Sequence, residues 1–216
     1  MSTVDSFQEE MPSFPIFQSW KEIIDFYQKF LSGKIESCPT HGGPLEEESQ
    51  VIKAQLLAIN RLSVLTIDSQ PGLLKANGSG NIYWRGRERL VDRIECRQRA
   101  ALLCFMYKPQ LEKLKKAFVK KDYLIFAQRA KVGVDSGAPR FTTPITTTSF
   151  VYRGKERTIT ESRQSTDGWI SCDMEMILEG SSEKKMILKN LYQVNLLDPV
   201  WGRTTQLFDD LIVALQ

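Results

Sequence analysis

The stretch from Lys53 to Pro71, KAQLLAINRLSVLTIDSQP, constrains the fold of this chain more than any other part of the sequence. Its first half has apolar residues at helical spacing, and its second half contains the apolar run VLTI, which is typical of a buried strand. Thr66 and Ser69 place hydroxyl groups at or just past the end of that strand. We interpret the stretch as a helix followed by a strand whose end can present hydrogen-bonding groups to a ligand.

The composition favours a folded domain without a catalytic centre. The 216 residues are 42% hydrophobic and 25% charged, which is enough apolar material for a real core. The four cysteines form no CxxC pair, and His41 is the only histidine. Cys38 and His41 have the spacing of half a zinc site, but we interpret them as loop residues. We therefore expect no metal site, and no Ser-His or Cys-His mechanism.

The sequence also bears on where the protein resides. It contains no apolar run of about 18 residues, so we expect no membrane span. Residues 1–16 are interpreted as an N-terminal arm, and the first residues, MSTVDSFQEEMPSF, resemble neither a signal peptide nor a transit peptide. These features predict a cytoplasmic protein.

Residues 17–216 are predicted to form a single domain in which helices and strands are mixed. Helices are expected at 17–31, 46–60, 109–121 and 204–215. Strands are expected at 63–67, 100–107, 123–127, 149–153, 157–161, 168–177 and 191–197. Residues 71–80 and 133–149 are interpreted as loops and 180–185 as an exposed turn. Because regular βαβ alternation and an internal repeat are not evident, we predict an α+β fold with mixed, largely antiparallel sheets flanked by helices.

Residues 85–131 form a basic segment with fourteen Lys and Arg against five Asp and Glu, a net charge of about +9, whereas the whole chain is only +3. A cationic surface of this kind can neutralise phosphates. The same residues can equally be the solvated sides of strands and of a helix. Since no RNP, KH or helix-turn-helix signature accompanies them, nucleic-acid binding is an alternative and not the leading hypothesis.

Several motifs are similar to one known family. The segment LLAINRLSVLTIDSQP resembles LL-x-x-N-R-x-x-(I/V)-L-T-I-N-S-Q-P, and FYQKFLSG, Gln98-Arg99-Ala100 and LYQVNLLD have counterparts in the same family. The chain thus resembles the C-terminal regulatory domain of eukaryotic methylenetetrahydrofolate reductase over most of residues 17–216. That domain binds S-adenosylmethionine and regulates the reductase barrel that precedes it.

The resemblance implies a set of ligand-binding residues. They are Glu48, Ser49, Thr66, Ser69, Thr148 and Thr160. Glu48 corresponds to the acid that receives the ligand's amino group, and Ser49 stands where the family has a threonine. The family's last threonine falls at Thr160 or Glu161, and a glutamate there is not equivalent. The implied ligand is S-adenosylmethionine or S-adenosylhomocysteine.

The flavin- and folate-binding barrel has no counterpart in this sequence, so we expect no flavin and no enzymatic activity. The leading hypothesis is a non-catalytic binding and regulatory module that works with a protein partner or as a homo-oligomer. The alternative is a structural subunit of a large macromolecular assembly, which has kept the fold, has lost the ligand, and contacts nucleic acid through residues 85–131.

Overall fold

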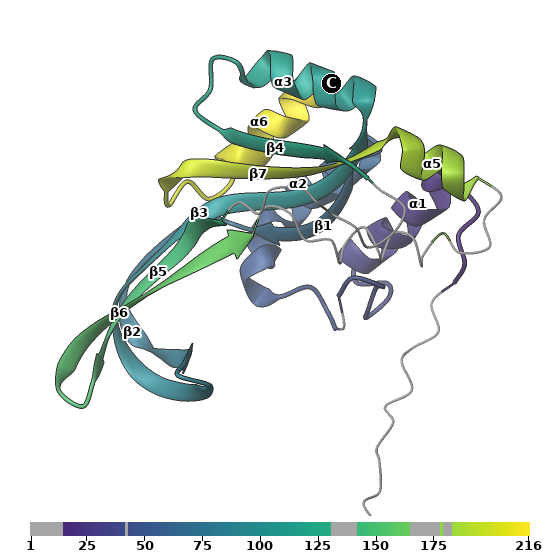
Figure 1. Cartoon of the computed structure of the whole chain (residues 1–216). Coiled ribbons are helices and arrows are strands. Elements are labelled where there is room, and N and C mark those ends of the chain that lie inside the picture. The colour runs from purple at the N-terminus through teal and green to yellow at the C-terminus, as the bar shows by residue number, and fades with distance from the viewer. Residues whose placement is uncertain (1–14, 42, 131–141, 165–177, 179–182) are drawn as a thin grey trace, which may run out of the picture.

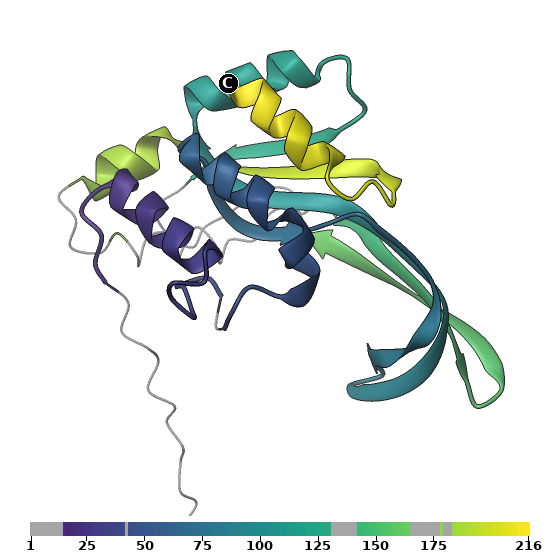
Figure 2. The same ribbon diagram turned by 180° about the vertical axis from the view of Figure 1, so that it is seen from behind.

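The structure is a computed structural model that describes residues 15–41, 43–130, 142–164, 178 and 183–216. It is an α+β domain built on largely antiparallel strands (Figures 1 and 2), as the sequence predicts. Of the predicted N-terminal arm at 1–16, only the last two residues lie within the described residues. The predicted strand at 168–177 lies entirely outside them. Among the described helices, none combines the length and the apolar character that crossing a membrane requires.

The helices begin and end where local signals place them. They are α1 (Trp20–Leu31), the 3-10 helix η1 (Glu47–Ile52), α2 (Lys53–Arg61), α3 (Lys108–Phe118), α5 (Lys184–Asn190) and α6 (Gln206–Leu215). Helix α1 starts three residues later than predicted because Ser19 is its N-cap and accepts a hydrogen bond from the backbone N–H of Glu22. Gly33, with φ of 79°, follows its C-terminus. The predicted helix at 46–60 is η1 followed by α2.

The strands are β1 (Leu65–Gln70), β2 (Leu73–Trp84), β3 (Arg87–Tyr107), β4 (Leu124–Arg129), β5 (Thr142–Tyr152), β6 (Lys155–Gln164) and β7 (Leu191–Trp201). The prediction of a loop at 71–80 was wrong, because β2 begins at Leu73 and pairs with β3. The predicted 133–149 loop is too long, because β5 begins at Thr142, where it pairs with β6, and pairs with β3 from Thr146 onwards. Strand pairing thus overrides the low strand propensity of glycine and asparagine. Helix α5 begins inside the predicted 180–185 turn and was not expected.

Strand β3 runs through the whole molecule and joins its two halves. Its C-terminal half lies between β1 and β7, with β4 beyond β7, and α1, α2, α3 and α6 cover one face of this sheet (Figure 2). The run from Ala100 to Met106 is buried throughout, and most of it belongs to the main core with β7 and these helices. Burial on both faces explains the continuous apolar sequence of this part of β3.

The N-terminal half of β3 belongs to a curled hairpin extension, defined here as β2, Arg87–Gln98 of β3, β5 and β6. Its strand order is β2-β3-β5-β6, and it projects from the body of the molecule (Figure 1). A small second core of Ile82, Val91 and Phe150 holds it together. The extension therefore has two hairpins side by side, with their turns at the same end.

The two turns are similar in sequence. Residues 84–89 read WRGRER and residues 152–157 read YRGKER. Both are two-residue turns in which arginine and glycine have positive φ: 51° and 72° at Arg85-Gly86, and 52° and 70° at Arg153-Gly154. These angles define the type I′ turn, which matches the twist of a hairpin.

Candidate functional site

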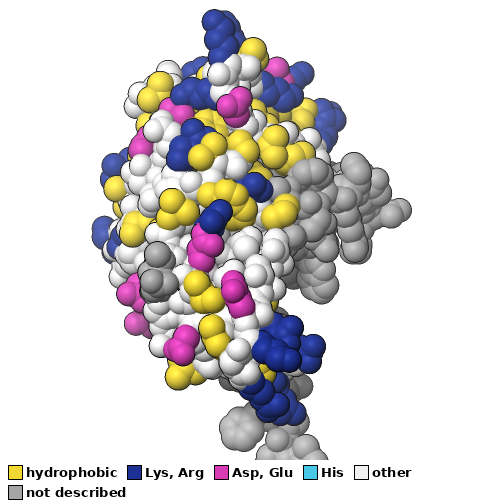
Figure 3. Space-filling view, turned by 90° about the vertical axis from the view of Figure 1, so that its left-hand side faces the viewer, with side chains coloured by type: hydrophobic (Ala, Val, Ile, Leu, Met, Phe, Trp, Pro, Cys, Tyr) yellow, Lys and Arg dark blue, Asp and Glu magenta, His cyan; other side chains and the backbone are white. Residues whose placement is uncertain are grey.

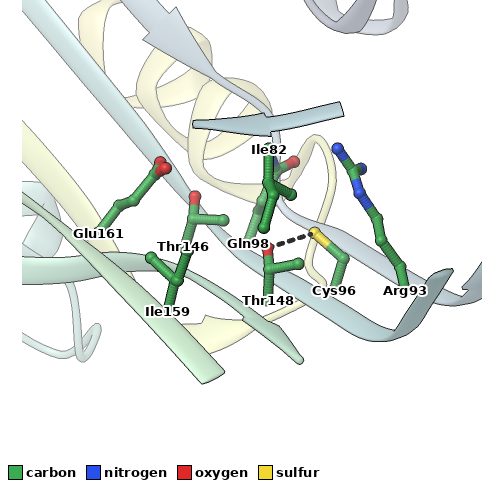
Figure 4. A pocket seen from close by; sticks show the side chains of 8 residues that line it. All are labelled: Ile82, Arg93, Cys96, Gln98, Thr146, Thr148, Ile159 and Glu161. Carbon is green, nitrogen blue, oxygen red and sulfur yellow. Dashed lines mark hydrogen bonds between the residues drawn. The ribbon is translucent and has the colours of Figure 1, made fainter. Parts of the chain in front are cut away.

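A cavity of about 180 Å³ lies on one face of the hairpin extension (Figure 4). All four strands of the extension contribute to it. Its lining residues are Ile82, Arg93, Cys96, Gln98, Thr146, Thr148, Ile159 and Glu161. We call the side of the extension that carries these residues the cavity face. The strand pairs Gln98–Thr146, Cys96–Thr148 and Thr146–Glu161 place these side chains together, because directly paired residues share a face.

An irregularity in β3 brings residues on either side of it onto the cavity face. The register between β3 and β5 shifts between Arg93 and Glu95, so that two β3 residues oppose one residue of β5. As a result Arg93 and Cys96 line the same cavity although they are three positions apart. Without the shift, strand alternation would direct Arg93 to the opposite face.

Opposite charges lie at the two ends of the cavity. Figure 4 shows the carboxylate of Glu161 at one end and the guanidinium of Arg93 at the other, with the threonine side chains between them. Thr148 donates a hydrogen bond to the sulfur of Cys96 at 3.6 Å. The arrangement can accommodate a ligand that carries a cationic and an anionic group and has hydroxyls or an apolar ring in between.

Glu48 is connected to this cavity through one side chain. The Nε2 group of Gln98 donates to Oε2 of Glu48 at 3.3 Å, and Gln98 itself lines the cavity. Glu48 is half-buried in η1, between the exposed Glu47 and the buried Ser49. The predicted acid therefore lies next to the cavity rather than in its wall.

The predicted hydroxyl groups are distributed over three environments. Ser49 donates to the carbonyl of Ser69 at 3.3 Å, so the start of η1 contacts β1 near its end. Thr66 is buried; its hydroxyl donates to Oδ1 of Asn60 at 3.1 Å, and its backbone N–H donates to the same atom at 3.0 Å. The cavity lining includes Thr148 but not Ser49, Thr66 or Ser69.

Thr160 lies on the side of β6 opposite the cavity. It pairs with Thr147, whereas the cavity residues Ile159 and Glu161 flank it and pair with Thr148 and Thr146. Thr160 is exposed. Of the two positions that the resemblance offered for the family's last threonine, the structure places Glu161 in the cavity and Thr160 outside it.

Sequence reasoning did not select Arg93, Gln98, Thr146 or Glu161. A usable signal was present, because YRGK at 152–155 contains the glycine of a tight turn and is flanked by segments rich in β-branched residues. Recognising it as a hairpin turn would have paired Thr146 and Thr148 with Glu161 and Ile159. The position of Arg93 depends on the register shift in β3, and no sequence pattern predicts this shift.

A second polar pocket lies at the other end of the domain, between the segment after α3 and α6. The hydroxyl of Tyr123 donates to Oδ2 of Asp210 at 2.6 Å, and Nζ of Lys121 lies 2.6 Å from Oδ1 of the same residue. Burial favours the neutral form of Tyr123 and, together with Asp210, raises the pKa of its hydroxyl. Asp210 of α6 thus binds both Tyr123 and Lys121 of the segment after α3, so the cluster is interpreted as a structural tie.

The cysteines do not form a metal site in the part of the chain that the structure describes. That part contains no group of three or more His, Cys, Asp and Glu residues able to hold a metal ion. Cys38 is buried beside Thr40, and burial raises the pKa of its thiol. The ring of His41 contacts the carbonyl of Pro44 at 3.0 Å. Cys104 is fully buried, and burial raises the pKa of its thiol as well.

Comparison with known protein families identifies the family of this chain. Residues 18–216 match the family described as a domain of unknown function, DUF6919, and the chain belongs to that family. The family description assigns no activity.

Part of the chain is also similar to an enzyme. It is methylenetetrahydrofolate reductase 1 of Schizosaccharomyces pombe (strain 972 / ATCC 24843), which is 36% identical over 69 residues. The matched region is 32% of this chain but only 11% of the reductase. A relationship to this reductase is thus supported over about a third of the chain, and the chain spans about a tenth of the relative's length.

Proposed function

We propose that this domain is a non-catalytic regulatory module that binds S-adenosylmethionine or S-adenosylhomocysteine at the cavity face and transmits occupancy to a protein partner. The observation that carries the proposal is the convergence on one cavity of two residues predicted independently of the structure. Thr148 lines the cavity, and Glu48 reaches it through Gln98 at 3.3 Å. The partial similarity to a methylenetetrahydrofolate reductase supports the same assignment.

The chemistry of the cavity suits the parts of such a ligand. The methionine portion carries an ammonium, for which the carboxylate of Glu48 is complementary. Thr146 and Thr148 offer hydroxyls for the ribose. Ile82 and Ile159 provide apolar surface against which a base can pack.

The size of the cavity determines how the ligand has to lie. Drug-sized ligands occupy pockets of about 300–1,000 Å³, whereas this cavity measures about 180 Å³. The cavity can therefore enclose only part of the ligand. We propose that the nucleoside portion occupies the cavity and that the amino-acid portion extends towards Glu48, which is half-buried and borders the cavity.

Titration calorimetry with both ligands tests the proposal. Saturable heat is expected with at least one of them, and no heat at millimolar ligand with folded protein would end it. Thr148→Val removes a hydroxyl of the cavity and should weaken binding about tenfold, the value of one hydrogen bond. Thr160→Val makes the same change on the opposite side of the sheet and should have no effect.

The alternative of a structural subunit predicts a different result. In that case neither ligand binds, and the native protein migrates with the mass of a large complex in size-exclusion chromatography. A small species that binds ligand contradicts it.

A further inference from the structure

The repeated turns give the hairpin extension an unequal distribution of charge between its two faces. Residues 85–93 and 153–157 contain seven basic and three acidic side chains, a net charge of +4. Charged residues alternate along the strands, so neighbouring residues of opposite sign point to opposite faces. The pattern therefore separates cations from anions rather than pairing them.

Pairing in β5 and β6 fixes the face of the second turn's cations. Lys155 pairs with Tyr152, and Arg157 pairs with Phe150. Phe150 belongs to the small core of the extension, and Tyr152 packs against it together with Ile159 of the cavity. Lys155 and Arg157 consequently lie on the cavity face, while Glu156 between them lies on the other face.

The first turn repeats this arrangement. Arg87, Arg89, Val91 and Arg93 alternate along β3, and Val91 belongs to the same small core. Arg93 pairs with Phe150 and lines the cavity. The intervening acids, which are Glu88 and Asp92, lie on the other face, where Asp92 accepts a hydrogen bond from Ser79 at 3.1 Å.

One side-chain contact joins the cations of the two hairpins. Arg89 of the first hairpin donates to the hydroxyl of Tyr152 of the second at 2.9 Å, and its guanidinium lies 5.1 Å from the centre of that ring. Arg153 lies 5.4 Å from the same ring. Tyr152 thus keeps guanidinium groups of both turns close together, and they act as one surface.

The outer cations of this surface are available to a partner. Arg87, Lys155 and Arg157 are exposed, and none of them forms a salt bridge with a residue in the described ranges. In Figure 3, Lys and Arg side chains gather at the lower end of the molecule, where the hairpins lie, apart from those at the upper end over α3. The lysines of α3 thus belong to a different surface.

We propose that the cationic side of the two hairpin turns, with Arg87, Arg89, Arg93, Lys155 and Arg157, binds the phosphate backbone of a single-stranded nucleic acid. Alternate residues of a strand are about 6.7 Å apart, and the cations of β3 and those of β6 form two rows about 9.6 Å apart because β5 runs between these strands. No acid lies between the two rows on this face, where β5 presents Phe150 and Tyr152. A phosphate backbone supplies negative charge as densely, and arginine contacts phosphate oxygens in a bidentate manner. An acidic polypeptide, whose carboxylates are intermittent, fits the array less well.

This surface differs from the basic segment expected from the sequence. It excludes the lysines of α3 and includes residues 153–157, which lie outside 85–131. Arg93 belongs both to this surface and to the cavity, whereas Arg87, Lys155 and Arg157 do not line the cavity. Substitutions at these three positions therefore test the inference separately from the ligand proposal.

Fluorescence anisotropy with a labelled single-stranded RNA oligonucleotide, and with the matching DNA, tests the inference. The variant R87Q/K155Q/R157Q should weaken binding at least tenfold. It should also lower the magnitude of the slope of log Kobs, the observed binding constant, against log salt concentration by about 2, because each lost phosphate contact accounts for about 0.7. The control K108Q/K116Q/K120Q removes three exposed cations of and beside α3 and should bind within twofold of the unchanged protein.

Several results would overturn the inference. These are no binding of the unchanged protein at about 50 mM salt, equal weakening by both triple variants, and competition by polyglutamate as effective as that by unlabelled RNA. The last result would assign the surface to an acidic protein. If the first triple variant does not fold, the three single variants replace it, and each should lower the salt slope by about 0.7.

Discussion

Glu48 and Gln98 are fifty positions apart in the sequence, yet Nε2 of Gln98 donates to Oε2 of Glu48 at 3.3 Å. The contact joins η1, which belongs to the helical side of the domain, to the strand that carries the cavity. A ligand that engages Glu48 would compete with Gln98 for the carboxylate, and Gln98 would then be released towards the cavity. Under the proposed function, occupancy of the cavity would thus alter the contact between η1 and β3.

The charge of Glu48 should determine ligand affinity more than stability. Glu48→Gln keeps an oxygen that can accept from Gln98 but removes the negative charge opposite an ammonium. Loss of a charge-assisted hydrogen bond of about 1.5–3 kcal/mol corresponds to about tenfold to a hundredfold weaker binding of S-adenosylmethionine in calorimetry. Glu47→Gln is the control, since Glu47 is exposed and adjacent. Equal effects of the two substitutions would remove Glu48 from the site.

The hydrogen bonds from Thr66 to Asn60 should contribute to the free energy of unfolding. Asn60→Ala removes the acceptor of two buried donors of Thr66, at 3.0 and 3.1 Å, and should lower the free energy of unfolding by about 2–4 kcal/mol. Thr66→Val removes only the hydroxyl and leaves the backbone contact, so a loss of about 1 kcal/mol is expected. Urea denaturation measures both. Equal losses would show that the backbone contact contributes nothing.

The main elements of the fold could be predicted because burial shapes their sequences. The apolar stripe that includes Ile23, Tyr27 and Leu31 predicted α1, and the continuous apolar run at 100–107 predicted the buried part of β3. Strand β2 contains Asn77 and Gly78, and among its side chains that the structure describes only Ile82 is buried. Its conformation is set by pairing with β3 along its length, which no local pattern encodes.

The candidate site was predictable only in part for a related reason. Glu48 and Thr148 came from a family resemblance, which fixes positions in the chain but not the face of a strand. Thr160 and Glu161 differ by one position and lie on opposite sides of β6. A strand has a period of two, so an alignment uncertain by one residue selects the wrong face.

Close contact between two loops should make Gly72 intolerant of a side chain. A Cβ atom at this position would lie 2.4 Å from the carbonyl oxygen of Arg203, which is backbone and cannot move aside. Gly72→Ala should therefore destabilise the protein by about 1–3 kcal/mol, as overpacking does. Gly43→Ala, where nothing lies within 4 Å, serves as the control and should be neutral or slightly stabilising. Thermal and urea denaturation distinguish these outcomes.

Low pH should weaken the contacts between α6 and the segment after α3, because these contacts depend on the carboxylate of Asp210. Burial alone would raise the pKa of this carboxyl, but hydrogen bonds from Lys121, Tyr123 and Gln206 outweigh it and hold the pKa below its ordinary value of 3.8. An acid whose pKa is lower in the folded than in the unfolded protein stabilises the folded state at pH values above its pKa in the unfolded protein. This stabilisation is lost as the pH falls through its pKa in the folded protein. The free energy of unfolding should thus decrease as the pH falls from about 4.

Asp210→Asn removes the titrating group and should make this acid limb shallower, while it lowers stability at neutral pH because the ion pair with Lys121 is lost. Asp209→Asn is the matched control, since Asp209 is exposed and next in the sequence. Urea denaturation between pH 7 and pH 3 gives the comparison. An acid limb of unchanged slope in Asp210→Asn would show that another carboxyl carries the pH dependence.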